Sequence, residues 1–236
     1  MSGPRRHATV VALAVLAAAL RLDAAAPTPV ASPTAVDTPF RATSHRTFED
    51  VAQWTKVFDD PARDAWQRPA TVVEALALAP GMTVADLGAG TGYFTTRLAR
   101  AVGPTGTVLA VETEPNMVVH LRARAERAGA ANVVPILGSA DNPRLPAGAV
   151  DLVLIVDTFH HIDHRLAYLK TLASRLAAGG RIAIIDWRKD DLPVGPPRDH
   201  KLARAQVVEE MQAAGYRLVV EPAILPYQYF LIFAPG

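Results

Sequence analysis

The residues best suited to hold a ligand lie in one glycine-rich segment, VADLGAGTGYF, at residues 84–94. An apolar run carries Asp86 near its end, and Gly88, Gly90 and Gly92 follow at alternate positions before a helical pattern begins. Glycine permits positive φ and leaves no Cβ between a ligand and the backbone. A plain tight turn would explain one glycine, whereas three glycines after an acid indicate a loop built around a ligand.

A second group of reactive side chains ends a later apolar run, where Asp157 is followed by His160 and His161. The carboxyl ends of strands in open α/β sheets bind ligands, so these side chains are candidate catalytic residues. A histidine can take a proton near neutral pH, although either ring can instead hold a loop through its N–H group. Adjacent histidines point different ways in an extended chain and no third ligand is suitably spaced, so we predict no metal site.

The composition removes several classes of function. The chain has 236 residues and no cysteine, which excludes disulfides, thiolate metal sites and a cysteine nucleophile. Lys plus Arg number 24 against 23 Asp plus Glu, so charge gives no reason to expect a nucleic-acid or membrane-surface partner. Half of the residues are hydrophobic, which is enough for one folded domain of this size.

Short apolar runs that alternate with amphipathic segments must position these residues. Expected strands are 83–87, 107–111, 133–137, 150–156 and 181–185, and expected helices are 93–102, 116–128, 164–176 and about 203–214. Glycines at 103, 129 and 179–180 are expected to end helices. This alternation predicts an α/β fold with a doubly wound parallel sheet. Strand-like runs at 216–220 and 229–233 are too close for a helical crossover and predict an antiparallel hairpin, for a sheet of seven strands.

The chain divides into three parts. Residues 1–26 look like a secretory signal peptide, with Arg5 and Arg6 before an apolar run and small residues before a cleavage site. Residues 27–47 are predicted to be a Pro-rich linker, and residues 48–236 a single domain with an N-terminal helical lid. A functional leader predicts a periplasmic or secreted protein without stable membrane insertion after cleavage; otherwise the protein is expected in the cytoplasm.

The glycine-rich segment resembles the first motif of class I S-adenosylmethionine-dependent methyltransferases. The resemblance extends over roughly Trp66 to Trp187 and is to the quinone-biosynthesis and related small-molecule enzymes of the type 11 group. It implies a Rossmann-like fold, with Asp86 near the amino-acid end of the cofactor and the loop residues beneath it. Those loop residues are Gly88, Ala89, Gly90, Gly92 and Tyr93. A dinucleotide enzyme is the competing interpretation, but its third glycine would fall at Tyr93.

Two further positions are assigned by the same resemblance. Glu112 ends the second expected strand and is implied to accept hydrogen bonds from both ribose hydroxyls, a role that dinucleotide enzymes share. Asp141, in the loop after the third strand, is implied to receive the adenine amino group with support from Asn142. An Asx turn before Pro143 is the alternative interpretation of this loop.

The expected function is methyl transfer from S-adenosyl-L-methionine to a small molecule by in-line displacement, in which alignment is required and a base is optional. A nucleic-acid acceptor is not expected. Asp157 is not followed by the two prolines and the aromatic residue with which amino-methylating enzymes of this fold stack an extruded base. Five aromatic residues can line an acceptor pocket or serve as core: Trp54, Phe58, Trp66, Trp187 and Tyr227. The alternatives are an exported protein that binds the adenosyl cofactor without catalysis, and a dinucleotide-dependent enzyme. The acceptor and the oligomeric state are not predicted.

Overall fold

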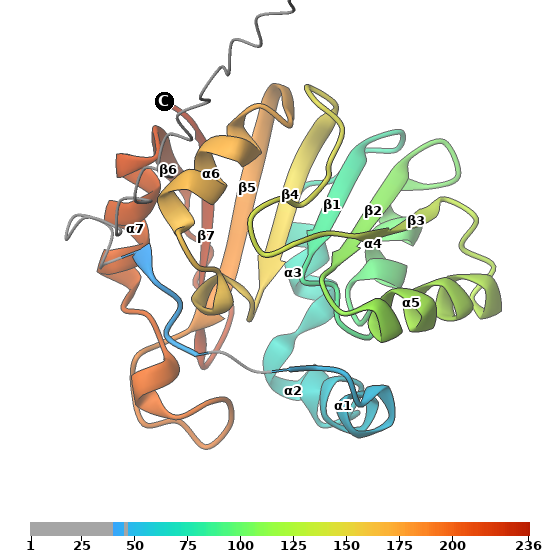
Figure 1. The fold of residues 1–236 in the computed structure, drawn as a ribbon, viewed down its shortest axis with the longest axis horizontal. Helices are drawn as coiled ribbons and strands as arrows, with labels where there is room; N and C mark the ends of the chain where they lie inside the picture. The colour runs from blue at the N-terminus through green and yellow to red at the C-terminus, as the bar shows by residue number, and fades with distance from the viewer. Residues whose placement is uncertain (1–39, 45–46) are drawn as a thin grey trace, which may run out of the picture. The chain divides into compact units, whose positions relative to one another are not determined.

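A seven-stranded sheet in the order β3-β2-β1-β4-β5-β7-β6 forms the centre of the domain (Figure 1). The computed structural model describes residues 40–44 and 47–236. Five neighbouring strands run parallel, and β7 lies antiparallel to both β5 and β6. The predicted fold class and the antiparallel C-terminal hairpin are both confirmed.

The bounds of the elements are close to those expected from the sequence. The strands are β1 (Thr83–Leu87), β2 (Thr107–Glu112), β3 (Val133–Leu137), β4 (Val150–Val156), β5 (Leu176–Trp187), β6 (Tyr216–Val220) and β7 (Gln228–Pro235). The α-helices are α1 (Val51–Phe58), α2 (Arg63–Gln67), α3 (Pro69–Ala75), α4 (Thr95–Val102), α5 (Pro115–Arg127), α6 (Arg165–Ala173) and α7 (Arg204–Ala213). Two short 3-10 helices, η2 (Phe159–His161) and η3 (Arg198–His200), follow β4 and β5.

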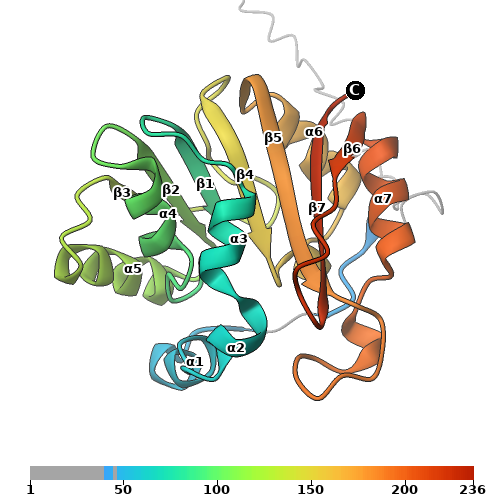
Figure 2. The same cartoon turned by 180° about the vertical axis from the view of Figure 1, so that it is seen from behind.

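Helices cover both faces of the sheet, as a parallel sheet with doubly apolar strands requires (Figures 1 and 2). Along β4, Leu152 and Leu154 join a core cluster with α3, α4 and α5, whereas Val153 and Ile155 join a second cluster with α6 and α7. This division follows from the two-residue period of strand side chains. The ligand-binding edge is thereby left to the loops at the carboxyl ends of the strands.

Strand β5 corrects one expectation about the glycines. Gly179 and Gly180 do not end a helix, because α6 stops at Ala173 and both glycines lie within β5. A Cβ on Gly180 would lie 2.7 Å from the carbonyl oxygen of Val150, where the β4–β5 register shifts. Gly180 therefore allows close strand approach at a bulge, which a sequence pattern cannot distinguish from a helix stop.

The predicted linker also needs a correction at its end. Residues 40–44 lie against the domain rather than forming unpacked chain: the Thr43 amide donates to the carbonyl oxygen of His160 at 2.9 Å. The Ala42 amide donates to Asp163 Oδ1 at 3.0 Å, and Phe40 is buried. The leader at 1–26 and the linker up to residue 39 lie outside the described residues. Within the described ranges, none of the helices combines the length and the apolar character needed to cross a membrane.

Candidate active site

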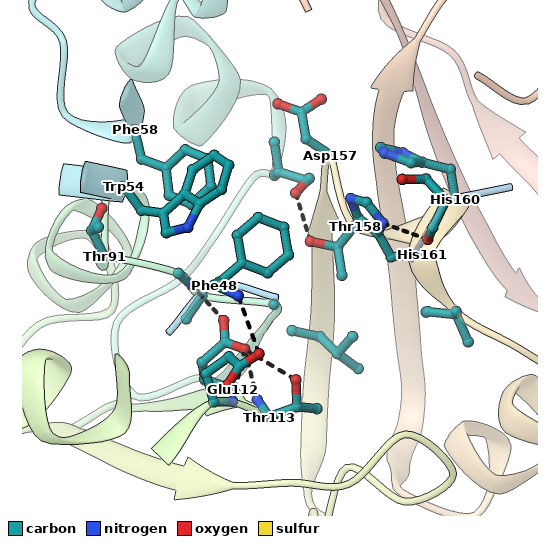
Figure 3. A pocket seen from close by; sticks show the side chains of 18 of the residues that line it. Phe48, Trp54, Phe58, Thr91, Glu112, Thr113, Asp157, Thr158, His160 and His161 are labelled. Carbon is teal, nitrogen blue, oxygen red and sulfur yellow. Dashed lines mark hydrogen bonds between the residues drawn. The ribbon is translucent and has the colours of Figure 1, made fainter. Parts of the chain in front are cut away.

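A cavity of about 740 Å³ opens at the carboxyl ends of β1, β2 and β4 (Figure 3). The glycine loop, the end of β2 and the segment after β4 line it from the sheet, and α1 and α2 line it from the N-terminal side. Its size lies within the range of about 300–1,000 Å³ that is usual for small-ligand sites. Sequence-predicted residues in its lining are Asp86, Gly88, Ala89, Gly90, Tyr93, Glu112, Asp157, His160 and His161.

The glycine loop adopts backbone conformations that only glycine takes readily. Gly88, Gly90 and Gly92 have φ values of 76°, 53° and 89°. A Cβ on Gly88 would lie 2.3 Å from Thr158 Oγ1, and one on Gly90 would lie 3.3 Å from the Phe58 ring. The loop is therefore pressed against the segment after β4 on one side and against α1 on the other.

Two predicted carboxylates flank this loop. Asp86 is buried and accepts a hydrogen bond from Thr95 Oγ1 at 2.6 Å, while burial raises its pKa to about 6. Glu112 accepts from the amide of Gly90 at 2.9 Å through Oε2 and from the amide of Thr113 at 2.6 Å through Oε1. Backbone donors thus hold the Glu112 carboxylate at the cavity wall. The lone pairs of its two oxygens that these donors do not use are available to accept hydrogen bonds from a ligand.

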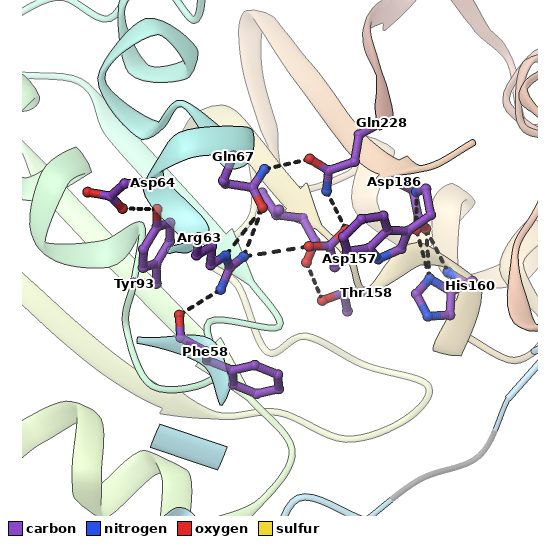
Figure 4. A network of polar contacts seen from close by, with 12 residues as sticks. Phe58, Arg63, Asp64, Gln67, Tyr93, Asp157, Thr158, His160, Asp186 and Gln228 are labelled. Carbon is purple, nitrogen blue, oxygen red and sulfur yellow. Dashed lines mark hydrogen bonds and ion pairs between the residues drawn. The ribbon is translucent and has the colours of Figure 1, made fainter. Parts of the chain in front are cut away.

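After the end of β4, Asp157 belongs to a partly buried polar network (Figure 4). Its Oδ1 accepts from Gln228 Nε2 at 2.6 Å, and its Oδ2 lies 3.5 Å from Arg63 Nη2. Gln67 Nε2 donates to Gln228 Oε1 at 2.8 Å, and Gln67 Oε1 accepts from Arg63 Nη2 at 3.1 Å. Burial raises the pKa of Asp157 to about 7, although the Arg63 guanidinium opposes the shift. Asp157 also has a φ of 52°, which is strained for a residue other than glycine.

The two histidines of η2 have different partners. His160 Nδ1 lies 2.9 Å from Asp186 Oδ1 and 3.0 Å from Asp186 Oδ2, and both residues are buried. His161 Nδ1 lies 2.9 Å from the carbonyl oxygen of Ser44, to which it must donate. Burial by itself lowers the pKa of His160, but the Asp186 and Asp157 carboxylates outweigh it and the net shift is upward. The contact between His160 and Asp186 therefore pairs an imidazole with a buried carboxylate.

Asp141 and Asn142 lie outside the cavity lining, on an exposed turn after β3. Asp141 accepts from Ser139 Oγ at 2.7 Å, and Asn142 Oδ1 accepts from the Arg144 amide at 2.8 Å. The second contact is an Asx turn, the alternative that the sequence left open. Their neighbours Ser139 and Ala140 do line the cavity. Gly92, the last predicted loop residue, is also absent from the lining and instead faces Leu121 of α5.

Aromatic side chains line the cavity between α1 and η2. The Phe48 ring lies 4.8 Å from Trp54 and 5.7 Å from His161, and Trp54 stacks on Phe58 at 5.2 Å between ring centroids (Figure 3). Of the five aromatic residues expected here, Trp54, Phe58, Trp66 and Trp187 line the cavity and Tyr227 does not. Phe48, Phe94 and Tyr168 also line the cavity and were not expected there.

Sequence reasoning missed the residues that support the site from distant parts of the chain. Asp186 interrupts the apolar run of β5, which is a usable signal because an acid in a buried strand needs a partner. Arg63, Gln67 and Gln228 carry no such signal, since their network forms only when α2 and β7 meet β4. In the part of the chain that the structure describes, no group of three or more His, Asp or Glu side chains is placed to hold a metal ion.

Residues 84–180 match a family model described as a methyltransferase domain. The ubiquinone/menaquinone biosynthesis C-methyltransferase UbiE of Ectopseudomonas mendocina is 28% identical over 130 residues, which are 55% of this chain and 50% of that protein. An uncharacterized methyltransferase of Mycobacterium tuberculosis is 34% identical over 131 residues, which are 56% of this chain and 50% of that protein. The chain thus spans about half the length of these curated relatives.

The solved structures extend this similarity over more of the fold. A SAM-dependent methyltransferase from Aquifex aeolicus is 28% identical and superimposes with a TM-score of 0.74, over 78% of this chain and 97% of that one. The matched strands, their order and the single reversed strand agree with the class I methyltransferase fold.

Proposed function

We propose that this chain, through its class I methyltransferase domain, transfers a methyl group from S-adenosyl-L-methionine to a small-molecule acceptor. The observation that carries the proposal is that one cavity is lined at once by the glycine loop, by Glu112 and by the end of β4. The family match over residues 84–180 and the relatives named above support the same activity.

The residues present fit this cofactor. Gly88, Ala89 and Gly90 of the glycine loop line the cavity, where a ligand can approach them closely. Glu112 offers the acceptor-only carboxylate that a ribose diol needs, and Asp86 lies beside the loop at the amino-acid end. When bound, the cofactor supplies a methyl group on a sulfonium, whose leaving group departs readily.

The adenine is proposed to lie beside the β3–β4 loop. Ser139 and Ala140 line the cavity there, and Asp141 and Asn142 follow them directly. Asp141 is then the candidate acceptor for the adenine amino group, with its carboxylate oriented by Ser139. An Asp141→Asn variant would lose this acceptor at one oxygen and is expected to weaken binding of the adenosyl group.

The acceptor is proposed to be a flat, largely apolar molecule. Trp54, Phe58 and Phe48 line the lid side of the cavity, and Trp66 and Trp187 lie together with ring centroids 5.0 Å apart. Aromatic rings favour stacked or edge-on packing with another ring. His160, His161 and Asp157 lie at this end, where they can align the acceptor and receive its proton.

Calorimetric titration of the full chain with S-adenosylhomocysteine tests the proposal, with NADH as the ligand that a dinucleotide enzyme would prefer. Binding of S-adenosylhomocysteine that is weakened in Glu112→Gln and kept in Glu209→Gln, an exposed change on α7, is the expected result. Binding of NADH alone would refute it. Transfer of radiolabelled methyl to a panel of small aromatic acceptors then separates an enzyme from a protein that only binds the cofactor.

Export is a separate proposal, which the character of residues 1–26 supports. A reporter fused to residues 1–40 is expected to leave the cytosol. An active reporter that stays in the cytosol would refute export without touching the proposed activity.

A further inference from the structure

We infer that Gly195 is a specificity-determining residue, which sets the size of the largest acceptor that the cavity can take. Because Gly195 has no Cβ, the Trp187 indole lies back against the segment after β5 and leaves the acceptor end of the cavity wide. The carrying observation is that a Cβ on Gly195 would lie within 2.9 Å of three ring carbons of Trp187. The inference rests on the proposed function and deepens it.

The three contacts place Gly195 over the face of the indole. The ring carbons Cδ2, Cε3 and Cζ3 of Trp187 are consecutive, and the added Cβ would lie 2.8, 2.7 and 2.9 Å from them. An approach along the edge of the ring would bring one carbon much closer than its two neighbours. Non-bonded carbon atoms pack at about 3.5–4.0 Å, so a side chain at this position needs roughly 0.8 Å more room than the structure leaves.

The indole borders the open space of the cavity. Trp187 ends β5 and is 5% exposed, and both Trp187 and Gly195 line the cavity. The Trp66 ring on α2 lies 5.0 Å from the Trp187 ring between centroids, at an interplanar angle of 44°. Since the indole is otherwise buried, a displaced ring moves into the cavity or against Trp66.

The segment that carries Gly195 is held in place by contacts at its ends. Figure 1 shows this segment, coloured orange between β5 and α7, extending past the carboxyl ends of the strands. The buried Lys201 Nζ donates to the carbonyl oxygen of Asp190 at 2.8 Å, which ties the end of the segment to its beginning. The carbonyl oxygen of His200 accepts from Thr43 Oγ1 at 2.6 Å. The segment is therefore fixed both to itself and to the N-terminal residues that pack on the domain.

Two prolines stiffen the segment beside Gly195. Pro196 and Pro197 follow it directly, and the pyrrolidine ring of a proline fixes φ at about −65°. The Trp187 side chain, in contrast, turns about two single bonds while its amide keeps its hydrogen bond to Asp186 Oδ1 at 2.8 Å. An added Cβ at residue 195 therefore moves the indole more readily than it moves the segment.

A positive φ alone would also favour glycine at this position, and a second glycine separates the two causes. Gly195 has a φ of 94°, and Gly215, after α7, has a φ of 91°. No atom lies within 4 Å of the position that a Cβ on Gly215 would take. Gly215→Ala is thus the matched control, which places alanine at a positive φ without any contact with an indole.

The consequence for the acceptor is a limit on its size. An indole displaced from Gly195 narrows the aromatic end of the cavity, where a large flat molecule needs the room and a small one does not. The cofactor end, formed by the glycine loop and Glu112, lies apart from this contact and should be unchanged. Gly195→Ala is therefore expected to act on acceptor size alone.

Circular dichroism of the full chain tests the displacement without any ligand. The chain has three tryptophans, and all three line the cavity: Trp54, Trp66 and Trp187. The electronic transitions of two indoles in contact couple, so their signal depends on the distance and angle between the rings. The coupled signal should be lost in Trp66→Phe, changed in Gly195→Ala and kept in Gly215→Ala. A wild-type spectrum that Trp66→Phe leaves unaltered, or a Gly195→Ala spectrum identical to wild type, would overturn the displacement.

Calorimetric titration with three amides of increasing size tests the specificity, on the full chain saturated with S-adenosylhomocysteine. The probes are benzamide, 2-naphthamide and anthracene-2-carboxamide. Gly195→Ala is expected to weaken binding of the largest amide about tenfold or more and that of benzamide by less than about twofold, whereas Gly215→Ala should change neither. An equal loss for all three amides would overturn the size limit. Binding of none of them to the wild type would overturn an acceptor end lined by two indoles.

A double variant separates this contact from a general loss of structure. Trp187→Phe shortens the ring system beneath Gly195, so adding Gly195→Ala to it should no longer discriminate between the three amides. The same discrimination in the presence and absence of Trp187→Phe would show that the indole is not involved. Binding of S-adenosylhomocysteine, measured first, should be equal in all these variants. A wild type that does not bind it would refute the proposed function, and the circular dichroism would still decide whether Gly195 positions the indole.

Discussion

Replacing Gly88 by alanine should destabilise the fold through one defined contact. The residue has a φ of 76°, and its added Cβ would lie 2.3 Å from Thr158 Oγ1 and 2.8 Å from Thr158 Cβ. Thr158 cannot turn away freely, because its Oγ1 donates to the carbonyl oxygen of Val156 at 2.9 Å. The end of β4 must therefore move.

The magnitude divides into a backbone part and a packing part. Left-handed backbone costs alanine about 1–2 kcal/mol, partly offset by about 0.4–1 kcal/mol from the lower entropy of its unfolded chain. Overpacking adds about 1–3 kcal/mol. Gly129→Ala isolates the first part, since Gly129 follows the end of α5 with a φ of 62° and no atom lies within 4 Å of the position that a Cβ would take. Gly88→Ala should therefore exceed Gly129→Ala by about 1–3 kcal/mol.

Urea unfolding followed by circular dichroism measures the unfolding free energy of both variants, which are compared at the same dependence of that free energy on urea concentration. A Gly88→Ala, Thr158→Ala double variant should recover part of the loss, because it removes Oγ1 and Cγ2 but leaves the Thr158 Cβ position filled. Equal destabilisation by Gly88→Ala and Gly129→Ala would refute the reasoning. It would mean that Thr158 and the segment after β4 can move away from an added Cβ at no cost in free energy.

Three further predictions concern charged side chains. Glu112→Gln should weaken S-adenosylhomocysteine binding in calorimetry about 10- to 100-fold, as expected for losing hydrogen bonds to a charged group; unchanged affinity would remove it from the site. The pKa of Asp157 is raised to about 7, so its contribution to stability is present below its unfolded pKa and lost as pH rises through about 7. Asp157→Asn should reduce that fall in urea unfolding between about pH 4 and pH 7.5, and an identical pH dependence would contradict the assignment. Glu210→Gln should cost about 3–5 kcal/mol in unfolding free energy because it removes the buried carboxylate that pairs with Arg165, whereas Glu221→Gln in an exposed pair should cost about 0–1 kcal/mol. Equal costs would refute that difference.

The strands were predictable because each is a short apolar run between turn residues. The predicted bounds of β1, β3, β4 and β6 match the structure residue for residue. Strand β5 was predicted only over 181–185, because its first residues include a glycine pair that also fits a helix stop. What requires glycine at position 180 is the carbonyl oxygen of Val150, which approaches this residue only after the sheet has formed.

The site was predictable where its residues end strands. Parallel strands bring their carboxyl ends to one edge, so the glycine loop, Glu112 and His160 meet there whatever the details of packing. Asp186 was missed since its partner depends on how η2 turns back over β5. The sequence did not decide between a ligand-binding role and an Asx turn for Asp141 and Asn142, because the same side-chain oxygen can accept a hydrogen bond from a ligand or from nearby backbone.

The reversed strand β7 does more than close the sheet. Its register places Gln228 opposite Trp187, and from there Gln228 donates to Asp157 at 2.6 Å and accepts from Gln67 at 2.8 Å. Gln67 in turn accepts from Arg63, whose guanidinium returns to Asp157. Each amide uses one donor and one acceptor, so the network fixes both orientations. Because α2 supplies two of these four residues, the same contacts determine the position of α2 and of the Asp157 carboxylate at the end of β4.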